Sequence, residues 1–180
     1  MGERRASSGR TFGLSPMARH AETDLDRLFA ELARASDEDE ARKVESKIWR
    51  LWAESGVEAA DRMLAVASEA MSRGAFAAAL ALLNSALETT GDFAEAWNKR
   101  ATLYYLIGEH DLAVHDIRRT LSLEPRHFGA MSGLGMICLQ RSDEAGALKA
   151  FRDALAVHPY LSGAQDAVDN LSGTVGEGEP

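Results

Sequence analysis

The residues able to do catalytic chemistry or to bind a metal are few and scattered along the chain. Histidine is the commonest ligand and general base among them, and the five histidines are His20, His110, His115, His127 and His158. His110 and His115 lie five residues apart, whereas two side chains on a helix face a common ligand when three or four residues separate them. No cysteine lies near enough to either histidine to complete a zinc site. We interpret all five as surface or turn residues and expect no metal site.

Four consecutive carboxylates, Asp37 to Glu40, resemble a cation site only in composition. Consecutive residues of a helix point in different directions, so the four side chains could not converge on one ion. Ser36 is a good helix N-cap, and the helix dipole stabilises carboxylates in the first turn. We therefore predict that Ser36 caps a helix that begins with this acidic run.

Two further features resemble reactive motifs. Cys138 is the only cysteine, so it has no partner for an internal disulfide, and its place in a helical pattern indicates a packing role rather than a nucleophile. Gly133 and Gly135 lie inside a predicted helix, not in the strand-to-helix loop that a phosphate-binding glycine motif requires. We expect no catalytic residue and no cofactor, and predict that the protein is not an enzyme.

The elements that position these residues follow a 34-residue period. Small residues, larger apolar residues and helix-ending residues each recur at that interval. These sets are Ala79, Ala113 and Ala147; Leu83, Ile117 and Phe151; and Gly91, Pro125 and Pro159.

Each unit contains two helices. In the middle unit, apolar residues spaced by threes and fours from Trp97 to Tyr105 predict a helix that ends near Gly108, and a second helix runs from about Asp111 until Pro125 forbids its continuation. The residues expected to face inward are Leu112, Ala113, Ile117, Thr120 and Leu121 in that helix, and Met63, Val66, Ala67 and Ala70 at the start of the first unit. A single hairpin cannot bury its own apolar face, so the units must stack.

These residues resemble the tetratricopeptide repeat signature, W-x2-L-G-x2-Y…A-x3-F…P, matched from Trp97 to Pro125 and from Met131 to Pro159. Arg100 departs from it by standing in the leucine slot. The resemblance implies an all-α fold, a right-handed α-solenoid of three helix-turn-helix repeats at 60–93, 94–127 and 128–161.

Helices are also predicted on both sides of the repeats. Apolar residues from Leu25 to Leu32 and from Val44 to Trp52 predict a helical hairpin over 19–56 that caps the N-terminal end of the array. It also looks like the leader of small bacterial tetratricopeptide proteins, some of which are exported. A C-terminal capping helix is expected at 162–171, and the tails at 1–18 and 172–180 are expected to be disordered.

Composition excludes several classes of partner. The 180 residues carry a formal net charge of -8, and no part of the predicted fold has the basic face that a phosphate backbone requires, so we do not expect nucleic acid binding. The longest apolar run, Phe76 to Leu83, is far shorter than the roughly 20 residues that span a bilayer. With no signal-peptide core behind the N-terminal arginines, we predict a cytoplasmic protein.

In the family that the chain resembles, the first helix of each repeat lines a concave groove that holds the ligand. The resemblance places these candidate groove residues on it: Leu64, Met71, Asn98, Thr102, Tyr105, Met136, Leu139 and Gln140. Some relatives clamp a chaperone's C-terminal carboxylate with lysine, asparagine and arginine, but the matching slots here hold Leu64, Ser68, Gly129 and Gly133.

We hypothesise that the groove binds an apolar or aromatic segment of a protein or peptide partner. Tyr105, Met136 and Leu139 would anchor the segment, and polar neighbours would pair with its backbone. Alternatively, some of these side chains only pack the groove wall or dock the N-terminal helices.

The predicted function is a non-catalytic protein-protein interaction module acting as an adaptor, scaffold or chaperone. The alternative is a homodimer or larger assembly formed through Trp49 and Trp52 or through the last repeat, with a layout that resembles bacterial secretion chaperones.

Overall fold

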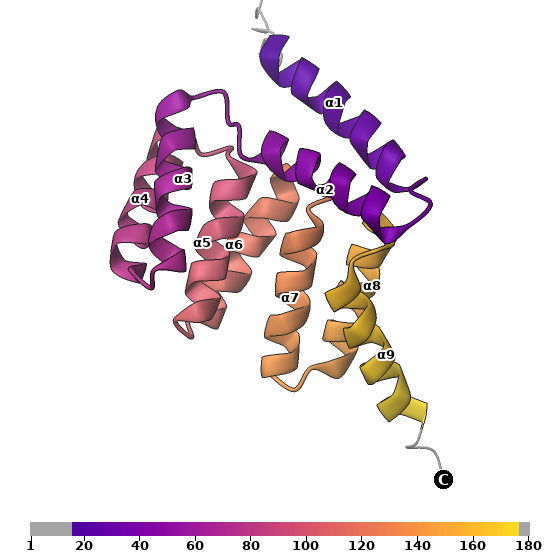
Figure 1. Cartoon of the computed structure of the whole chain (residues 1–180). Coiled ribbons are helices and arrows are strands. Elements are labelled where there is room, and N and C mark those ends of the chain that lie inside the picture. The colour runs from indigo at the N-terminus through magenta and orange to yellow at the C-terminus, as the bar shows by residue number, and fades with distance from the viewer. Residues whose placement is uncertain (1–15, 177–180) are drawn as a thin grey trace, which may run out of the picture.

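The computed structural model describes residues 16–176, and the side chains of residues 23–173 (Figure 1). Every regular element in this range is a helix. The helices are α1 (Pro16–Leu32), α2 (Glu38–Trp52), α3 (Glu58–Ser72), α4 (Phe76–Thr89), α5 (Ala94–Leu106), α6 (His110–Leu123), α7 (Phe128–Gln140), α8 (Glu144–Val157) and α9 (Ser162–Gly176). The predicted all-α helical-repeat solenoid is confirmed.

The three repeats are the antiparallel pairs α3–α4, α5–α6 and α7–α8. The tight turns inside the first two pairs use Gly74 and Gly108 at φ of 73° and 83°, a region that glycine enters without steric cost. The third pair uses Ser142 at φ 57°. The repeated alanines are fully buried, and a Cβ at Gly135 would lie 2.7 Å from the Phe151 ring. Small residues therefore set how closely the helices approach.

Two residues predicted to face inward do not. Val66 is 48% exposed and Leu112 is 46% exposed. Both lie at the edge of an apolar stripe, where helical periodicity alone does not decide which side is covered. Their neighbours Ala67 and Ala113 carry the contacts instead, with no exposed surface.

The cap and the ends of the terminal helices also differ from expectation. Asp37, not Ser36, is the N-cap of α2, because its carboxylate accepts the N–H of Glu40 at 2.8 Å. Ser36 instead donates its backbone N–H and hydroxyl to the Glu40 carboxylate, a reciprocal capping arrangement. Helix α1 begins at Pro16 and α9 continues to Gly176, so both extend into segments expected to be disordered. The rest of those segments, 1–15 and 177–180, lies outside the described residues.

The N-terminal hairpin α1–α2 does not lie where a cap on the first repeat would lie. Helix α2 crosses the upper ends of the repeats in Figure 1 and reaches the third one. Its apolar face, with Ile48 and Trp52, packs with Leu32 of α1 against Phe128 of α7 and Ala154 of α8. This hairpin therefore shapes the concave side of the solenoid.

Candidate interaction groove

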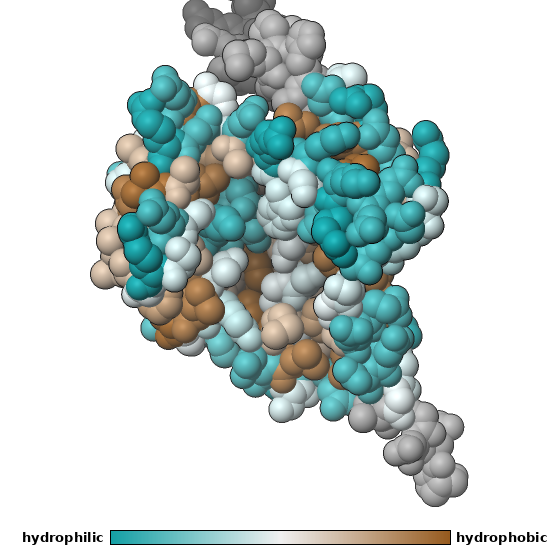
Figure 2. All heavy atoms as spheres, in the orientation of Figure 1, coloured by the Kyte–Doolittle hydropathy of each residue, from teal (hydrophilic) through white to brown (hydrophobic). Residues whose placement is uncertain are grey.

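The concave side is formed by the first helices of the three repeats, α3, α5 and α7, with α2 along its upper edge (Figure 1). Figure 2 views this side and shows apolar and neutral residues in its hollowed centre, flanked by hydrophilic residues on the right. The predicted groove residues fall into two groups, one next to α2 and one at the opposite, lower end.

The lower end is where apolar side chains are exposed. Leu106 is 53% exposed and Met136 is 44% exposed. Tyr105 lies beside them, stacked on His110 at 5.6 Å between ring centroids, and its hydroxyl accepts a hydrogen bond from Gln140 Nε2 at 3.4 Å. Two side chains of neighbouring repeats thus meet across this part of the groove.

Other predicted groove residues contribute mainly to its wall. Leu139 packs into the cluster under α9, and Met71 packs against the core of the first repeat. The Thr102 hydroxyl donates to the Asn98 backbone oxygen at 3.0 Å, and the Asn98 amide donates to Glu95 at 2.9 Å. Met136 is therefore the most accessible of the three residues proposed as anchors.

The end next to α2 is closed by aromatic rings. Trp49 lies against α7 at Gly129, where a Cβ would come within 2.7 Å of the indole. Trp52 stacks on the His127 ring, with centroids 4.0 Å apart and planes 9° from parallel. Phe128 contacts both tryptophans edge-on or tilted. This aromatic cluster attaches α2 to the repeats.

His127 links that cluster to a buried polar network. Its Nδ1 accepts the Ala130 N–H at 3.1 Å, which places the proton on Nε2, and Nε2 donates to Glu95 at 3.0 Å. Glu95 also lies 3.6 Å from the Lys99 ammonium. Both His127 and Glu95 are buried, so their mutual hydrogen bond offsets the cost of desolvation.

Two of the histidines interpreted as surface or turn residues do not lie at the surface. His127 is fully buried as the N-cap of α7, and His158 is 1% exposed at the end of α8. His158 Nε2 lies 3.4 Å from the Glu45 carboxylate. They occupy turns as predicted, but the hairpin covers those turns. Their burial could have been inferred from the apolar face of α2, because Trp49 and Trp52 on that face need another surface to cover them.

The pKa shifts of Glu45 and Cys138 indicate structural roles for both side chains and not chemical reactivity. The neighbouring His158 holds the pKa of Glu45 below its ordinary value, and a hydrogen bond from Trp49 Nε1 acts in the same direction. Burial raises the pKa of the Cys138 thiol, and the nearby Asp143 raises it further. Because the thiolate is the reactive form, Cys138 has the character of a packing residue.

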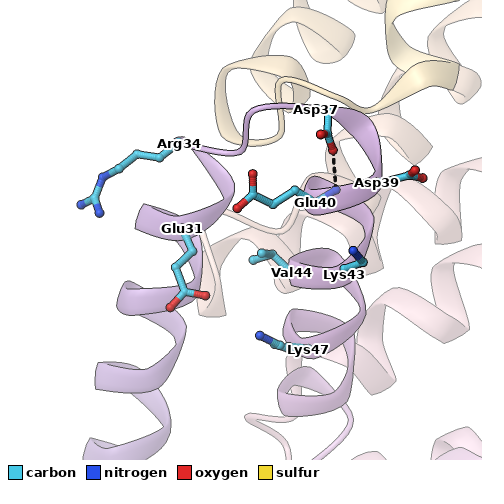
Figure 3. A pocket seen from close by; sticks show the side chains of 8 residues that line it. All are labelled: Glu31, Arg34, Asp37, Asp39, Glu40, Lys43, Val44 and Lys47. Atoms are coloured by element: carbon cyan, nitrogen blue, oxygen red, sulfur yellow. Dashed lines mark hydrogen bonds between the residues drawn. The ribbon is translucent and has the colours of Figure 1, made fainter.

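The acidic run lines a separate, open depression of about 690 Å³ between α1 and α2 (Figure 3). Four carboxylates and three cationic side chains line it, and Asp39 and Glu40 point in opposite directions (Figure 3). Over the described range, no group of three or more histidine, cysteine or acidic side chains is arranged to hold a metal ion. The depression therefore has the mixed charge of a solvated surface.

Between residues 16 and 176, no helix combines the length and apolar character needed to cross a bilayer.

Comparison with known proteins matches the repeat region to one family. The model of the tetratricopeptide repeat matches residues 64–117 and 107–162. A TPR repeat-containing protein of Rhizobium etli is 35% identical over 148 residues, which are 82% of this chain and 72% of that protein.

Solved structures show the same fold. The first TPR of Spaghetti (RPAP3), bound to the HSP90 peptide SRMEEVD, aligns with a TM-score of 0.63 at 15% identity, over 67% of this chain and 95% of that one. A MamA structure aligns with a TM-score of 0.59 at 16% identity, over 88% and 84%. On the sequence match and the repeat geometry together, the chain belongs to the tetratricopeptide repeat family.

Proposed function

We propose that this protein is a non-catalytic interaction module that binds a peptide or helical segment of another protein on its concave face, below α2. The observation that carries the proposal is the exposure of Leu106 and Met136 on a recessed face. Apolar side chains gathered in a concave site, next to polar groups that can orient a ligand, are typical of binding surfaces. The tetratricopeptide family consists generally of such modules.

The chemistry of this face favours an apolar or aromatic segment. Met136, Leu106 and Tyr105 offer apolar surface, while Gln140 and the tyrosine hydroxyl lie at its margin. Spaghetti was solved with the peptide SRMEEVD, in which three of the last four residues are acidic. The corresponding clamp slots here carry no charge, so we expect a peptide of that kind to bind poorly.

The alternative of assembly through Trp49 and Trp52 has less support. Trp52 is 6% exposed, and both rings lie in the contact between the hairpin and the third repeat. We also propose a cytoplasmic location, which rests only on the lack of a signal-peptide core behind the N-terminal arginines.

Site-specific photo-crosslinking in native cells tests the proposed surface. A photoreactive amino acid at Met136 or Leu106 should yield the same covalent partner adduct, whereas one at Arg118, an exposed residue of α6 on the opposite side, should not. Met136→Asp should reduce the adduct formed from position 106. Equal adducts at 118 and 136 would place the partner elsewhere.

A further inference from the structure

Beneath α2 lies a second recess of the concave side, separate from the exposed lower end. This cavity, of about 360 Å³, lies where α2, α3 and α5 meet. Its apolar walls come from Trp49, Ala53, Leu64 and Ala65, and its polar lining comes from Asp61, Ser68, Glu95 and Lys99. The cavity therefore has both apolar walls and charged groups.

The charges in this cavity are unbalanced toward the negative. Asp61 and Glu95 contribute two carboxylates, and Lys99 contributes one ammonium group. Ser55 donates both its N–H and its hydroxyl to Oδ1 of Asp61, at 2.8 and 2.5 Å, and no described hydrogen bond engages Oδ2. One carboxylate is therefore in excess of the local cations.

We propose that the partner segment carries a lysine or arginine whose side chain enters this cavity. Its aliphatic stem would pack on Leu64 and Trp49, and its cation would lie by Asp61 and Glu95, where the indole face adds cation–π attraction. This inference rests on the proposed function and specifies the chemistry of the partner. Charge complementarity favours a basic side chain over an acidic one, which would meet two carboxylates.

The spacing of the two recesses predicts a sequence pattern in the partner. The cavity lies between α3 and α5, whereas Tyr105 and Met136 belong to α5 and α7. The cavity residues Glu95 and Lys99 also precede Tyr105 on α5 by ten and six residues, which is about 9 to 15 Å along the helix axis. Packed helices lie about 10 Å apart, and an extended chain rises about 3.3 Å per residue. An apolar residue about four to five positions from the basic residue would therefore reach the lower end.

Calorimetric titration of the full chain with capped peptides tests this pattern. The probes are AKSALFA and two variants in which methionine or glutamate replaces the lysine. The lysine peptide should bind about tenfold more tightly than the methionine peptide, a difference of about 1.4 kcal/mol, and the glutamate peptide should bind most weakly.

Two protein variants assign the effect to the cavity. Asp61→Asn retains an oxygen that can accept both Ser55 bonds but removes the charge, so the preference for lysine should fall severalfold. Glu69→Gln is the matched control, because it removes the same charge from the same helix at an exposed residue paired with Arg73. It should leave the preference unchanged.

The outcomes separate this inference from the proposed function. Equal affinity for the lysine and methionine peptides overturns the basic-residue proposal alone, whereas binding that Met136→Asp does not weaken argues against the proposed groove itself. Tighter binding of the glutamate peptide also overturns the inference. If replacing Arg4, Arg5 and Arg10 by serine raises affinity for the lysine peptide tenfold, the chain's own N-terminal segment, not a partner, is the occupant.

Discussion

Arg100 stands in the leucine slot of the repeat signature, and the surrounding residues explain how an arginine is accommodated there. Its guanidinium donates to both oxygens of Asp116, at 2.7 and 3.0 Å, and to Asn84 at 2.8 Å. Asp116 is 1% exposed. The guanidinium also lies over the Trp97 ring, 4.7 Å from its centroid. A two-pronged hydrogen-bonded pair thus replaces an apolar contact between α5 and α6.

Removing one member of this pair should cost more than removing both. Arg100→Ala leaves a buried carboxylate without its main partner, which typically costs about 3 to 5 kcal/mol of unfolding free energy. Arg100→Leu combined with Asp116→Ala restores the apolar residue of the signature and should cost less than Arg100→Ala alone. Urea denaturation of the two variants measures the difference. A double variant that is less stable than Arg100→Ala would contradict the coupling of the charged pair.

At the scale of the helices, the repeat period predicted most of the fold because packing residues recur in register. The residues at equivalent positions of the repeats also indicate whether another helix covers the outer face of α3. Ala96 and Ala130 are fully buried against the preceding unit, whereas the residue in the same column of α3 is Arg62, which is exposed. Leu103 and Ile137 are buried in another column, whose α3 member is the exposed Glu69. The outer face of α3 is polar and requires no cap.

The position of the hairpin could not be predicted in the same way. Amphipathic patterning indicates which face of α2 is apolar, but not which distant surface covers it. The polar outer face of α3 indicates that the hairpin does not pack on the first repeat. Gly129 indicates a contact with α7 instead, because a glycine on the groove side leaves room for an aromatic ring. The candidate groove residues lie on α3, α5 and α7, the first helices of the repeats, but the hydrogen bonds of Asn98 and Thr102 depend on side-chain directions that spacing does not determine.

The effect of Gly129→Ala on stability should therefore change sign when Trp49 is replaced. Alanine normally stabilises a helix relative to glycine by up to about 1 kcal/mol. In the wild-type chain, Gly129→Ala should instead destabilise by about 1 to 3 kcal/mol, because the new Cβ would overlap the Trp49 indole. In a Trp49→Ala background the same substitution should stabilise. Thermal unfolding of the four proteins gives this double-mutant cycle, and the same sign in both backgrounds would contradict the contact.

At the scale of the whole molecule, the hairpin joins the start of the chain to its last repeat. Arg126 pairs with Asp26 at 2.6 Å and lies over the Phe29 ring at 4.3 Å. The Tyr160 hydroxyl donates to the Ala35 oxygen at 3.0 Å. In a linear solenoid each repeat contacts only its neighbours, so stability spreads from one unit to the next. Here the chain's first helices are coupled to a repeat about 100 residues away.

This closure predicts where the molecule loosens when the hairpin is weakened. Trp52→Ala removes a large buried ring from the contact with His127 and Phe128, a loss of about 3 to 5 kcal/mol. Hydrogen exchange should then accelerate in α1, α2 and the start of α7, and less in α3 and α4, although α3 follows α2 directly in sequence. Trp52→Phe keeps a ring and removes an indole Nε1 that is buried without a described hydrogen bond, so it should stay closer to wild type.

A tryptophan inside the array provides the comparison. Trp97 packs against the core of the first repeat and donates from Nε1 to the Gly91 oxygen at 3.0 Å. Trp97→Ala should therefore accelerate exchange in α4 and α5 and leave the hairpin protected. If Trp52→Ala loosened α3 and α4 before α7, the hairpin would be coupled to the array through the chain connection and not through the aromatic cluster. Faster exchange at α7 with α4 unchanged would show that the hairpin is coupled to the third repeat through their direct contact, of which the Trp52 ring is part.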